Sequence, residues 1–249
     1  MRAKITHQYK DYVVDLGNPL DISMPLGRNP QNASAWDCPA VAIRAVETEH
    51  FIGDVNRGGA VNFRNIFFNP HGNGTHTECL GHISKQWISI NQQLNQYFFL
   101  VQLLSVQPKQ EGVDQVIKKE QLVEKWDDTQ TTEAILIRTL PNGSDKLKRQ
   151  YTNTNPPYLN SEAVHWLVNQ AVKHLLIDLP SVDREKDDGK LIAHHIFWNY
   201  PENPRLDCTI TELVYIPNYI KDGLYFLNLQ VAPFENDASP SRPVLYKII

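Results

Sequence analysis

The sequence predicts an α/β fold, because compact apolar runs of strand length alternate with segments that have helical spacing. Residues 98–106 and 134–138 are such apolar runs, and residues 120–126 between them carry apolar side chains at helical intervals. This β-α-β order is typical of proteins in which helices cover a sheet. The 249 residues contain no internal repeat and no linker that clearly divides them, so we expect a single domain over residues 1–249.

The N-terminal part of the chain favours turns and short strands. Residues 11–60 are rich in Pro, Gly and Asn, with short apolar runs such as residues 41–46 between them. Residues 60–68 alternate loosely and are followed by Asn69 and Pro70, which predicts a strand that runs into a loop. The histidine-rich residues 71–82 are then expected on that loop.

A helix and a buried strand are predicted further along the chain. Residues 161–172 place four apolar side chains on one helical face, with Asn160 or Ser161 as a suitable N-cap. Residues 174–179 have the composition of a buried strand that ends at Asp178. The ends of strands in α/β proteins are common places for active groups.

Composition and charge narrow the classes of function. The chain has 24 basic and 28 acidic residues without long like-charge blocks, so no nucleic-acid-binding surface is indicated. No stretch approaches the roughly 18 apolar residues of a membrane span, and the first residues lack an apolar leader segment. We therefore expect a soluble, cytoplasmic protein that acts on a small molecule. The three cysteines lie far apart without a CxxC pair, so a metal site would use histidine and carboxylate ligands.

Such ligands occur together in the histidine-rich segment. His76 and Glu78 stand two residues apart, so an extended backbone projects both side chains from one face toward a shared cation. Gly72 and Gly74 give the preceding loop the freedom for a tight turn. Imidazole and carboxylate suit Zn²⁺ or Mn²⁺, and such an ion with an open position makes hydroxide available near neutral pH.

Each of these residues also has an ordinary structural interpretation. An HxE pair in a loop is more often solvated or hydrogen-bonded than bound to a metal. The pair His194 and His195 is compatible with a helix surface, and Glu212 with an exposed strand position. Alone, none of these residues decides the function.

The order of several motifs resembles the putative cyclase family, which includes bacterial kynurenine formamidase and isatin hydrolase. Gly-Thr-His-Thr-Glu at residues 74–78, followed by His82, is similar to the family's HxGTHxDxPxH motif. Five further elements follow the family's order: Asp-Ile-Ser at 21–23, Ile-Leu-Ile-Arg-Thr at 135–139, Ile-Asp-Leu-Pro-Ser-Val-Asp at 177–183, Ala-His-His at 193–195 with the later Glu212, and Ser-Pro-Ser-Arg at 239–242.

The resemblance implies a swivelling β/β/α fold and metal-dependent hydrolysis of a carboxamide or cyclic amide, as in an arylformamidase. One or two divalent ions, zinc or manganese, would be held by His76, Glu78, His194 and Glu212, with Glu78 a candidate bridging ligand. His82 would be the general acid and base, since histidine changes protonation near neutral pH. Asp178, Ser181 and Asp183 would support the site. A dimer or tetramer is implied by the resemblance alone.

The sequence departs from the family pattern in three places. The family's first histidine lies four residues before the second, and Gly72 occupies that position, so His71 is displaced by one residue. His71 is either a ligand reached through a one-residue bulge, or its metal subsite is missing. Glu78 replaces an aspartate, Leu80 replaces a proline, and residues 197–205 lengthen the spacing between His194 and Glu212.

These departures leave other functions to be weighed. One alternative is a catalytically altered metal- or ligand-binding protein on the same fold, and another is a cysteine hydrolase that uses Cys79 beside His82. An extended backbone would point Cys79 away from Glu78, which disfavours the second. Of the aromatic residues, Trp36 and Trp198 lie near the motifs and are the preferred candidates to line a pocket for an aromatic substrate.

Overall fold

The computed structural model describes residues 1–28 and 32–249, and it confirms the predicted α/β class. Its centre is a curled sheet of nine strands. Four neighbouring strands of this sheet run parallel, and the strands outside them are antiparallel. In spatial order they are β17 (Ala238–Pro240), β8 (His76–Glu78), β15 (Thr209–Glu212), β14 (His174–Ile177), β12 (Ala134–Thr139), β9 (Phe98–Val106), β16 (Gly223–Asn228), β18 (Val244–Lys247) and β3 (Leu20–Asp21).

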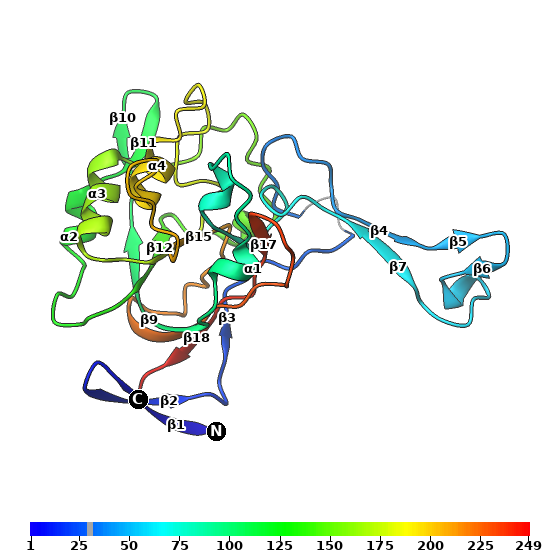
Figure 1. Cartoon of the computed structure of the whole chain (residues 1–249), viewed down its shortest axis with the longest axis horizontal. Helices are drawn as coiled ribbons and strands as arrows, with labels where there is room; N and C mark the ends of the chain where they lie inside the picture. The colour runs from blue at the N-terminus through cyan, green and yellow to red at the C-terminus, as the bar shows by residue number, and fades with distance from the viewer. Residues whose placement is uncertain (29–31) are drawn as a thin grey trace.

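The central strands are buried on both faces, as expected for parallel strands covered on each side. All six residues of β12 are buried. On one face, Ile135 and Ile137 pack against the helices, and on the other face, Leu136 packs against loop segments and β16. Figure 1 shows the helices gathered beside β12. They are α2 (Lys119–Val123), α3 (Ser161–Asn169) and α4 (Ile192–Trp198); elsewhere lie the short α1 (Ile90–Gln93) and the 3-10 helices η1 (Val55–Arg57), η2 (Leu80–His82) and η3 (Ser144–Lys148).

Helix α3 has the predicted start and ends earlier than predicted. The Asn160 side chain accepts a hydrogen bond of 2.9 Å from the Ala163 N–H, as an N-cap residue does. The helix ends at Asn169 because Ala171 adopts a positive φ of 58°, outside helical geometry. Among the described residues, no helix has the length and apolar character that a membrane crossing requires.

Smaller sheets surround the centre, and two of them form a projecting arm (Figure 1). The arm contains the hairpin of β4 (Ala42–Ala45) with β7 (Arg64–Phe67) and, beyond it, β5 (Glu47–Thr48) with β6 (Phe51–Ile52). Phe63, Ile66 and Phe67 on it are exposed. The homo-oligomer implied by the resemblance stays a prediction. The remaining strands are β1 (Arg2–His7), β2 (Lys10–Asp15), β10 (Lys109–Glu111), β11 (Asp114–Ile117) and β13 (Tyr158–Leu159).

Two expectations about the histidine-rich region are revised. The strand predicted over residues 60–68 is confined to β7, in the arm. His76 and Glu78 do not lie on a loop, because they form β8, which pairs with β15 and β17 inside the nine-stranded sheet. The extended conformation inferred for this pair is therefore fixed by hydrogen bonding on both sides.

His174 at the start of β14 makes the stability of the fold sensitive to acid. Its Nδ1 lies 2.9 Å from Thr209 Oγ1, its ring packs on Phe99, and burial lowers its pKa to about 3. The unfolded chain binds this proton at a pKa of about 6.5, so the stability gained from neutral His174 is lost as the pH falls below 6.5. Between about pH 7.5 and pH 5, we expect the wild type to lose about 2 kcal/mol more than His174→Asn.

Urea unfolding at the two pH values measures this difference. The matched control is His165→Asn, since His165 is exposed on α3 and its replacement should leave the wild-type pH dependence intact. Parallel pH profiles for the wild type and His174→Asn would rule out the assigned role of His174.

Candidate metal centre

The pairing of β8 with β15 brings three of the predicted residues to one face of the sheet. Glu212 lies opposite His76, and Ile210 lies opposite Glu78. Residues two apart on a strand share a face, so His76, Glu78 and Glu212 all project toward the side covered by α4. His76 and Glu78 are buried, and Glu212 is only 4% exposed, so the interpretation of Glu212 as an exposed carboxylate is wrong.

His194 reaches the same point from α4. Its Nε2 lies 3.0 Å from Glu78 Oε1 and 4.0 Å from Glu212 Oε1. Its Nδ1 lies 2.6 Å from Asp183 Oδ2, and Asp183 also accepts hydrogen bonds from the backbone N–H groups of Ala193 and His194. Of the two adjacent histidines, His194 therefore faces the site, whereas His195 Nδ1 bonds to the Tyr200 carbonyl.

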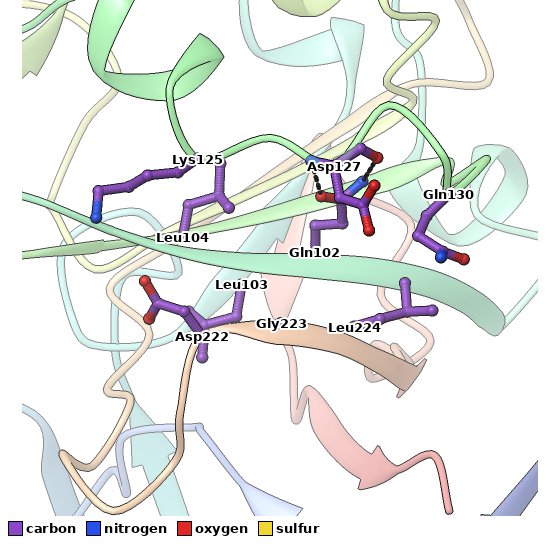
Figure 2. A pocket seen from close by; sticks show the side chains of 9 residues that line it. All are labelled: Gln102, Leu103, Leu104, Lys125, Asp127, Gln130, Asp222, Gly223 and Leu224. Carbon is purple, nitrogen blue, oxygen red and sulfur yellow. Dashed lines mark hydrogen bonds between the residues drawn. The ribbon is translucent and has the colours of Figure 1, made fainter.

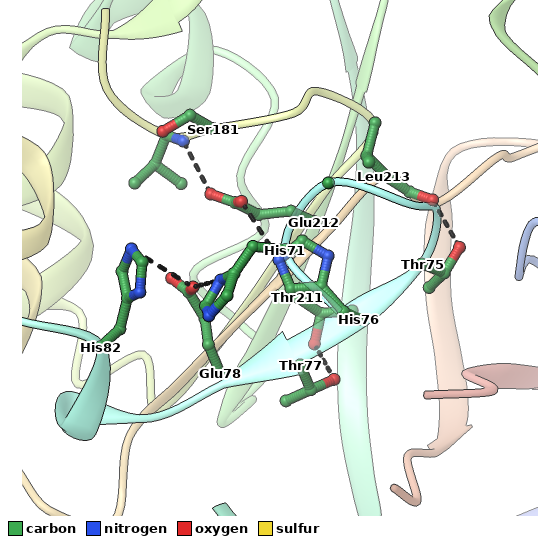
Figure 3. Close-up of polar contacts among 12 residues, drawn as sticks. His71, Thr75, His76, Thr77, Glu78, His82, Ser181, Thr211, Glu212 and Leu213 are labelled. Atoms are coloured by element: carbon green, nitrogen blue, oxygen red, sulfur yellow. Dashed lines mark hydrogen bonds and ion pairs between the residues drawn. The ribbon is translucent and has the colours of Figure 1, made fainter. Parts of the chain in front are cut away.

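His71 and His82 complete the group from the loop and from η2. His71 Nδ1 lies 3.1 Å from Glu78 Oε2, and His82 Nε2 lies 3.8 Å from the same oxygen. The two rings stack with centroids 4.2 Å apart. Figure 3 shows both imidazoles turned toward Glu78, with Glu212 reaching toward His76 on the other side. All six predicted site residues therefore converge.

One further carboxylate, that of Asp237, was not predicted. Its Oδ2 lies 2.8 Å from His71 Nε2 and 3.4 Å from His82 Nδ1. Asp237 is separated from both histidines by more than 150 positions and belongs to no recognised motif. The sequence contained one signal that could have identified Asp237: it lies two residues before the Ser-Pro-Ser-Arg element at 239–242.

The supporting residues form hydrogen bonds around the ligand candidates. The Val182 N–H donates to Glu212 Oε1 over 3.0 Å, and Ser181 Oγ accepts from the Asp183 N–H over 3.1 Å. Asp178 is fully buried and accepts from the Thr139 N–H and hydroxyl and from Lys146 Nζ. These hydrogen bonds hold the segment after β14 against the site.

Histidines and carboxylates in this group shift one another's pKa. Burial opposes the charged form of His71, but its contacts with the carboxylates of Asp237 and Glu78 outweigh it and raise its pKa to about 10. Burial likewise opposes charge on His194, and its contacts with Asp183 and Glu78 still raise its pKa well above the ordinary value. Burial favours the protonated form of Glu78, but the neighbouring His82, His194 and His71 hold its pKa well below the ordinary value. Glu78 is thus an anionic ligand candidate surrounded by imidazoles.

Two buried atoms at the centre show that the residues fit a cation. Within residues 1–28 and 32–249, neither His76 Nε2 nor Glu78 Oε2 has a hydrogen-bond partner of suitable geometry. The other ring nitrogen of His76, Nδ1, does have a partner, because it lies 3.0 Å from the Gly74 carbonyl oxygen. Each of the two unpaired atoms has an ionisable neighbour instead: Glu212 Oε2 lies 3.5 Å from His76 Nε2, and His71 Nδ1 lies 3.1 Å from Glu78 Oε2. Buried polar atoms nearly always have hydrogen bonds, so two buried atoms without them in one histidine–carboxylate cluster fit a missing ligand. Imidazole nitrogen with carboxylate oxygen is a donor set for Zn²⁺ or Mn²⁺.

Glu78 is common to two groups of potential ligand atoms. It lies with His71 and His76 in one group and with His82 and His194 in the other, and the ligand atoms of each group lie within 4.8 Å of one another. A carboxylate has two oxygens, so this placement is compatible with the bridging role considered for Glu78.

The metal-centre candidates lie at one side of a cavity of about 320 Å³. Trp36, Cys38 and Leu191 contribute to its wall, and His82 and His194 contribute polar atoms. Trp36 has a positive φ of 62°, a conformation that bulky residues rarely adopt and that often accompanies function. Trp198 does not line this cavity. It is completely buried against His194, so the expectation of a pocket role for it is wrong.

The loop geometry explains why this chain has no histidine at position 72. A Cβ atom on Gly72 would overlap the Cys38 side chain and lie 2.9 Å from the Ala35 carbonyl oxygen. The Ala35 N–H also donates to the Gly72 carbonyl over 3.0 Å. Close packing therefore excludes a side chain at Gly72, and His71 supplies the imidazole instead.

Cys79 is poorly placed to act as a nucleophile. Its thiol is buried and lies 3.5 Å from the Ile88 carbonyl, on the side of the sheet away from the helices. Burial raises its pKa to about 12, whereas a reactive cysteine needs a lowered pKa. The geometry thus disfavours the cysteine-hydrolase alternative.

A second cavity, of about 340 Å³, lies beside β9 and β16 (Figure 2). The Gln102 side chain bonds to the Asp127 backbone through both its amide nitrogen and its oxygen, and Asp222 pairs with Arg138 and Ser105. The cavity lining contains no histidine. Gln102 and Asp222 are thus bonded to neighbouring protein atoms, so we place the chemistry in the first cavity.

Solved structures share this fold at low sequence identity. A predicted metal-dependent hydrolase from Bacillus stearothermophilus matches with 15% identity and a TM-score of 0.62 over 92% of this chain and 98% of its own. Isatin hydrolase A from Labrenzia aggregata, bound to benzyl benzoate, matches with 15% identity and a TM-score of 0.67 over 92% and 93%. Isatin hydrolase A from Ralstonia solanacearum matches with 13% identity and a TM-score of 0.64 over 92% and 91%.

The family of the chain is established by a sequence model rather than by these structures. No curated protein matches the chain. A family model described as Putative cyclase matches residues 14–184, which include β8, His82 and the segment through Asp183. Because this match extends over more than half of the sequence, the chain belongs to the putative cyclase family.

Proposed function

We propose that this chain is a metal-dependent hydrolase of a carboxamide or cyclic amide, similar in reaction to an arylformamidase. The observation that carries the proposal is the convergence of imidazole nitrogens from His71, His76 and His194 on the carboxylates of Glu78 and Glu212. Structural neighbours described as isatin hydrolases and a predicted metal-dependent hydrolase support the same class of reaction.

These five residues would hold one or two divalent ions. When bound, zinc or manganese supplies a Lewis acid that polarises a carbonyl and lowers the pKa of water. Three of these side chains are already oriented by a hydrogen bond from a polar atom that would not bind the metal. Asp183 holds His194 Nδ1, the Gly74 carbonyl holds His76 Nδ1, and the Val182 N–H holds Glu212. Such supporting contacts orient the ligands and limit their reorganisation.

His82 is the proposed general acid and base. Its side chain is 30% exposed and lines the cavity, so water and substrate reach it, unlike the buried His76. His82 Nε2 would accept a proton from the attacking water and return it to the amide nitrogen as the C–N bond breaks. One histidine then serves both proton transfers, because the proton that Nε2 takes from the water is the one that the leaving amide nitrogen requires.

The cavity favours a small substrate with an aromatic ring. Trp36 and Leu191 provide apolar contacts at the wall, and the polar groups of the metal centre lie at one side. Small-molecule sites commonly combine apolar walls with a few fixed polar groups in this way.

Hydrolysis assays on chelator-stripped protein test the proposal. An arylformamide, isatin and an aryl ester are incubated with the chain, with and without added Zn²⁺ or Mn²⁺. We expect metal-dependent hydrolysis of at least one amide, and a loss of about 100-fold or more in kcat for His82→Ala. Cys79→Ala is the control and should retain full activity.

Two negative results have different meanings. Binding of less than about 0.2 equivalents of metal would contradict the metal centre itself. Metal binding without hydrolysis of any of these substrates would instead support the alternative of a catalytically altered binding protein. The displaced His71 is the feature of this chain that favours that alternative.

A further inference from the structure

Asp237 is fixed beside the metal centre by backbone contacts with the strand that carries Glu78. Its carbonyl accepts a hydrogen bond of 3.0 Å from the Cys79 N–H, and the next residue, Ala238, lies opposite Glu78 in the β8–β17 pair. A Cβ atom on Gly81 would lie 3.0 Å from the Asp237 Cβ, so the two segments approach closely. The Asp237 carboxylate therefore has a defined position relative to Glu78.

A single oxygen of this carboxylate faces two imidazoles. Asp237 Oδ2 lies 2.8 Å from His71 Nε2, and it lies 3.4 Å from His82 Nδ1. The side chain is 27% exposed and lies on the outer side of His71, whereas Glu78 is 1% exposed and lies on the inner side. His71 is thus held between an outer carboxylate and an inner one.

This arrangement repeats a pattern found at the two other histidines proposed as metal ligands, His76 and His194. His194 directs Nδ1 to Asp183 and Nε2 to Glu78, and His76 directs Nδ1 to the Gly74 carbonyl and Nε2 toward Glu212 Oε2, 3.5 Å away. In each case one ring nitrogen contacts a supporting acceptor and the other faces the centre. A histidine that donates N–H to a carboxylate presents its other nitrogen as a metal-ligating lone pair.

We infer that Asp237 is the positioning residue that makes the displaced His71 a metal ligand in this chain. By accepting the Nε2–H, it selects the tautomer in which Nδ1 carries the lone pair toward Glu78. Asp237 thereby compensates for the side chain that close packing excludes at Gly72. The inference rests on the proposed function, since it presupposes a metal at this centre.

Equilibrium binding of Zn²⁺ to the metal-stripped full chain tests the inference. We expect Asp237→Asn to weaken Zn²⁺ binding by about 10- to 100-fold, the usual effect of losing a carboxylate that supports a ligating histidine. Asp237→Ser, which also lacks the carboxylate, is measured alongside in case one variant folds poorly. Glu235→Gln is the matched control on the same loop, because Glu235 bonds to Asn91 and Gln92 and should leave the affinity unchanged.

A double-mutant cycle with His71→Ala separates positioning from a general structural effect. If Asp237 acts through His71, Asp237→Asn should change the affinity little in the His71→Ala background, because the two losses are not additive. Wild-type affinity in Asp237→Asn and Asp237→Ser, or an equal loss in both backgrounds, would overturn the inference. Failure of the wild type itself to bind Zn²⁺ would overturn the proposed function, which distinguishes the two outcomes.

Discussion

Replacing Glu78 with glutamine should reduce Zn²⁺ affinity more than about 100-fold and reduce metal-dependent hydrolysis with it. Glu78 belongs to two of the three groups of potential ligand atoms found among the described residues, and it is 1% exposed. Glutamine keeps the size of the side chain but removes the negative charge that faces His71 and His194. A neutral amide is also a poorer ligand than a carboxylate for zinc. Equilibrium dialysis against buffered Zn²⁺ measures the change.

The matched control for this variant is Glu120→Gln. Glu120 is exposed on α2, and its replacement removes the same charge without touching the metal centre. Far-UV circular dichroism verifies that both variants are folded. Unchanged Zn²⁺ affinity in folded Glu78→Gln would mean that the ion, if bound, lies elsewhere.

Replacing Lys146 with methionine should destabilise the fold by about 3–5 kcal/mol. Lys146 is 1% exposed, and its ammonium group donates to the Thr139 carbonyl, the Thr139 hydroxyl and Asp178 Oδ2 over 2.6, 2.9 and 2.7 Å. Burial lowers the pKa of Lys146 and raises that of Asp178, so each charge depends on the other. Without Lys146, Asp178 is a buried carboxylate that lacks its cation. Urea unfolding at neutral pH measures the loss.

Two further variants test whether the loss of stability comes from the buried Lys146–Asp178 pair. Lys148→Met lies in the same 3-10 helix but is exposed, and its effect should stay within about 0.5 kcal/mol. The double variant Lys146→Met with Asp178→Asn removes both charges and should be less destabilised than Lys146→Met alone. A double variant as unstable as the sum of the single variants would show that the two charges do not depend on each other.

The fold was predictable where the hydrophobic pattern was continuous. Residues 98–106 form β9 with the predicted bounds, and the apolar run at 134–138 forms β12 with one additional residue. Their patterns are clear because parallel central strands are buried on both faces. By contrast, β8 is only three residues long and contains His76 and Glu78, so no apolar pattern distinguishes it from a loop. Its strand conformation comes from pairing with β15 and β17, which are distant in sequence.

The candidate site was predictable through the order of motifs and not through local chemistry. Glu212 joins the site because the strand register places it opposite His76. His194 joins it because α4 carries its side chain to Glu78. Neither placement can be read from the local sequence. Asp237 contacts its histidines only in the folded chain, so neither spacing nor composition identified it. Trp198 shows the reverse error, because an aromatic residue in a polar, loop-like segment proved to belong to the core.

Anomalous scattering from crystals grown with Zn²⁺ tests the central claim most directly. The account predicts one or two peaks within coordination distance, roughly 2.0–2.2 Å, of His76 Nε2, His194 Nε2 and a Glu78 oxygen. His71 Nδ1 should face a peak while its Nε2 remains bonded to Asp237. Crystals without a peak among these atoms, or with zinc bound only elsewhere on the chain, would contradict the account.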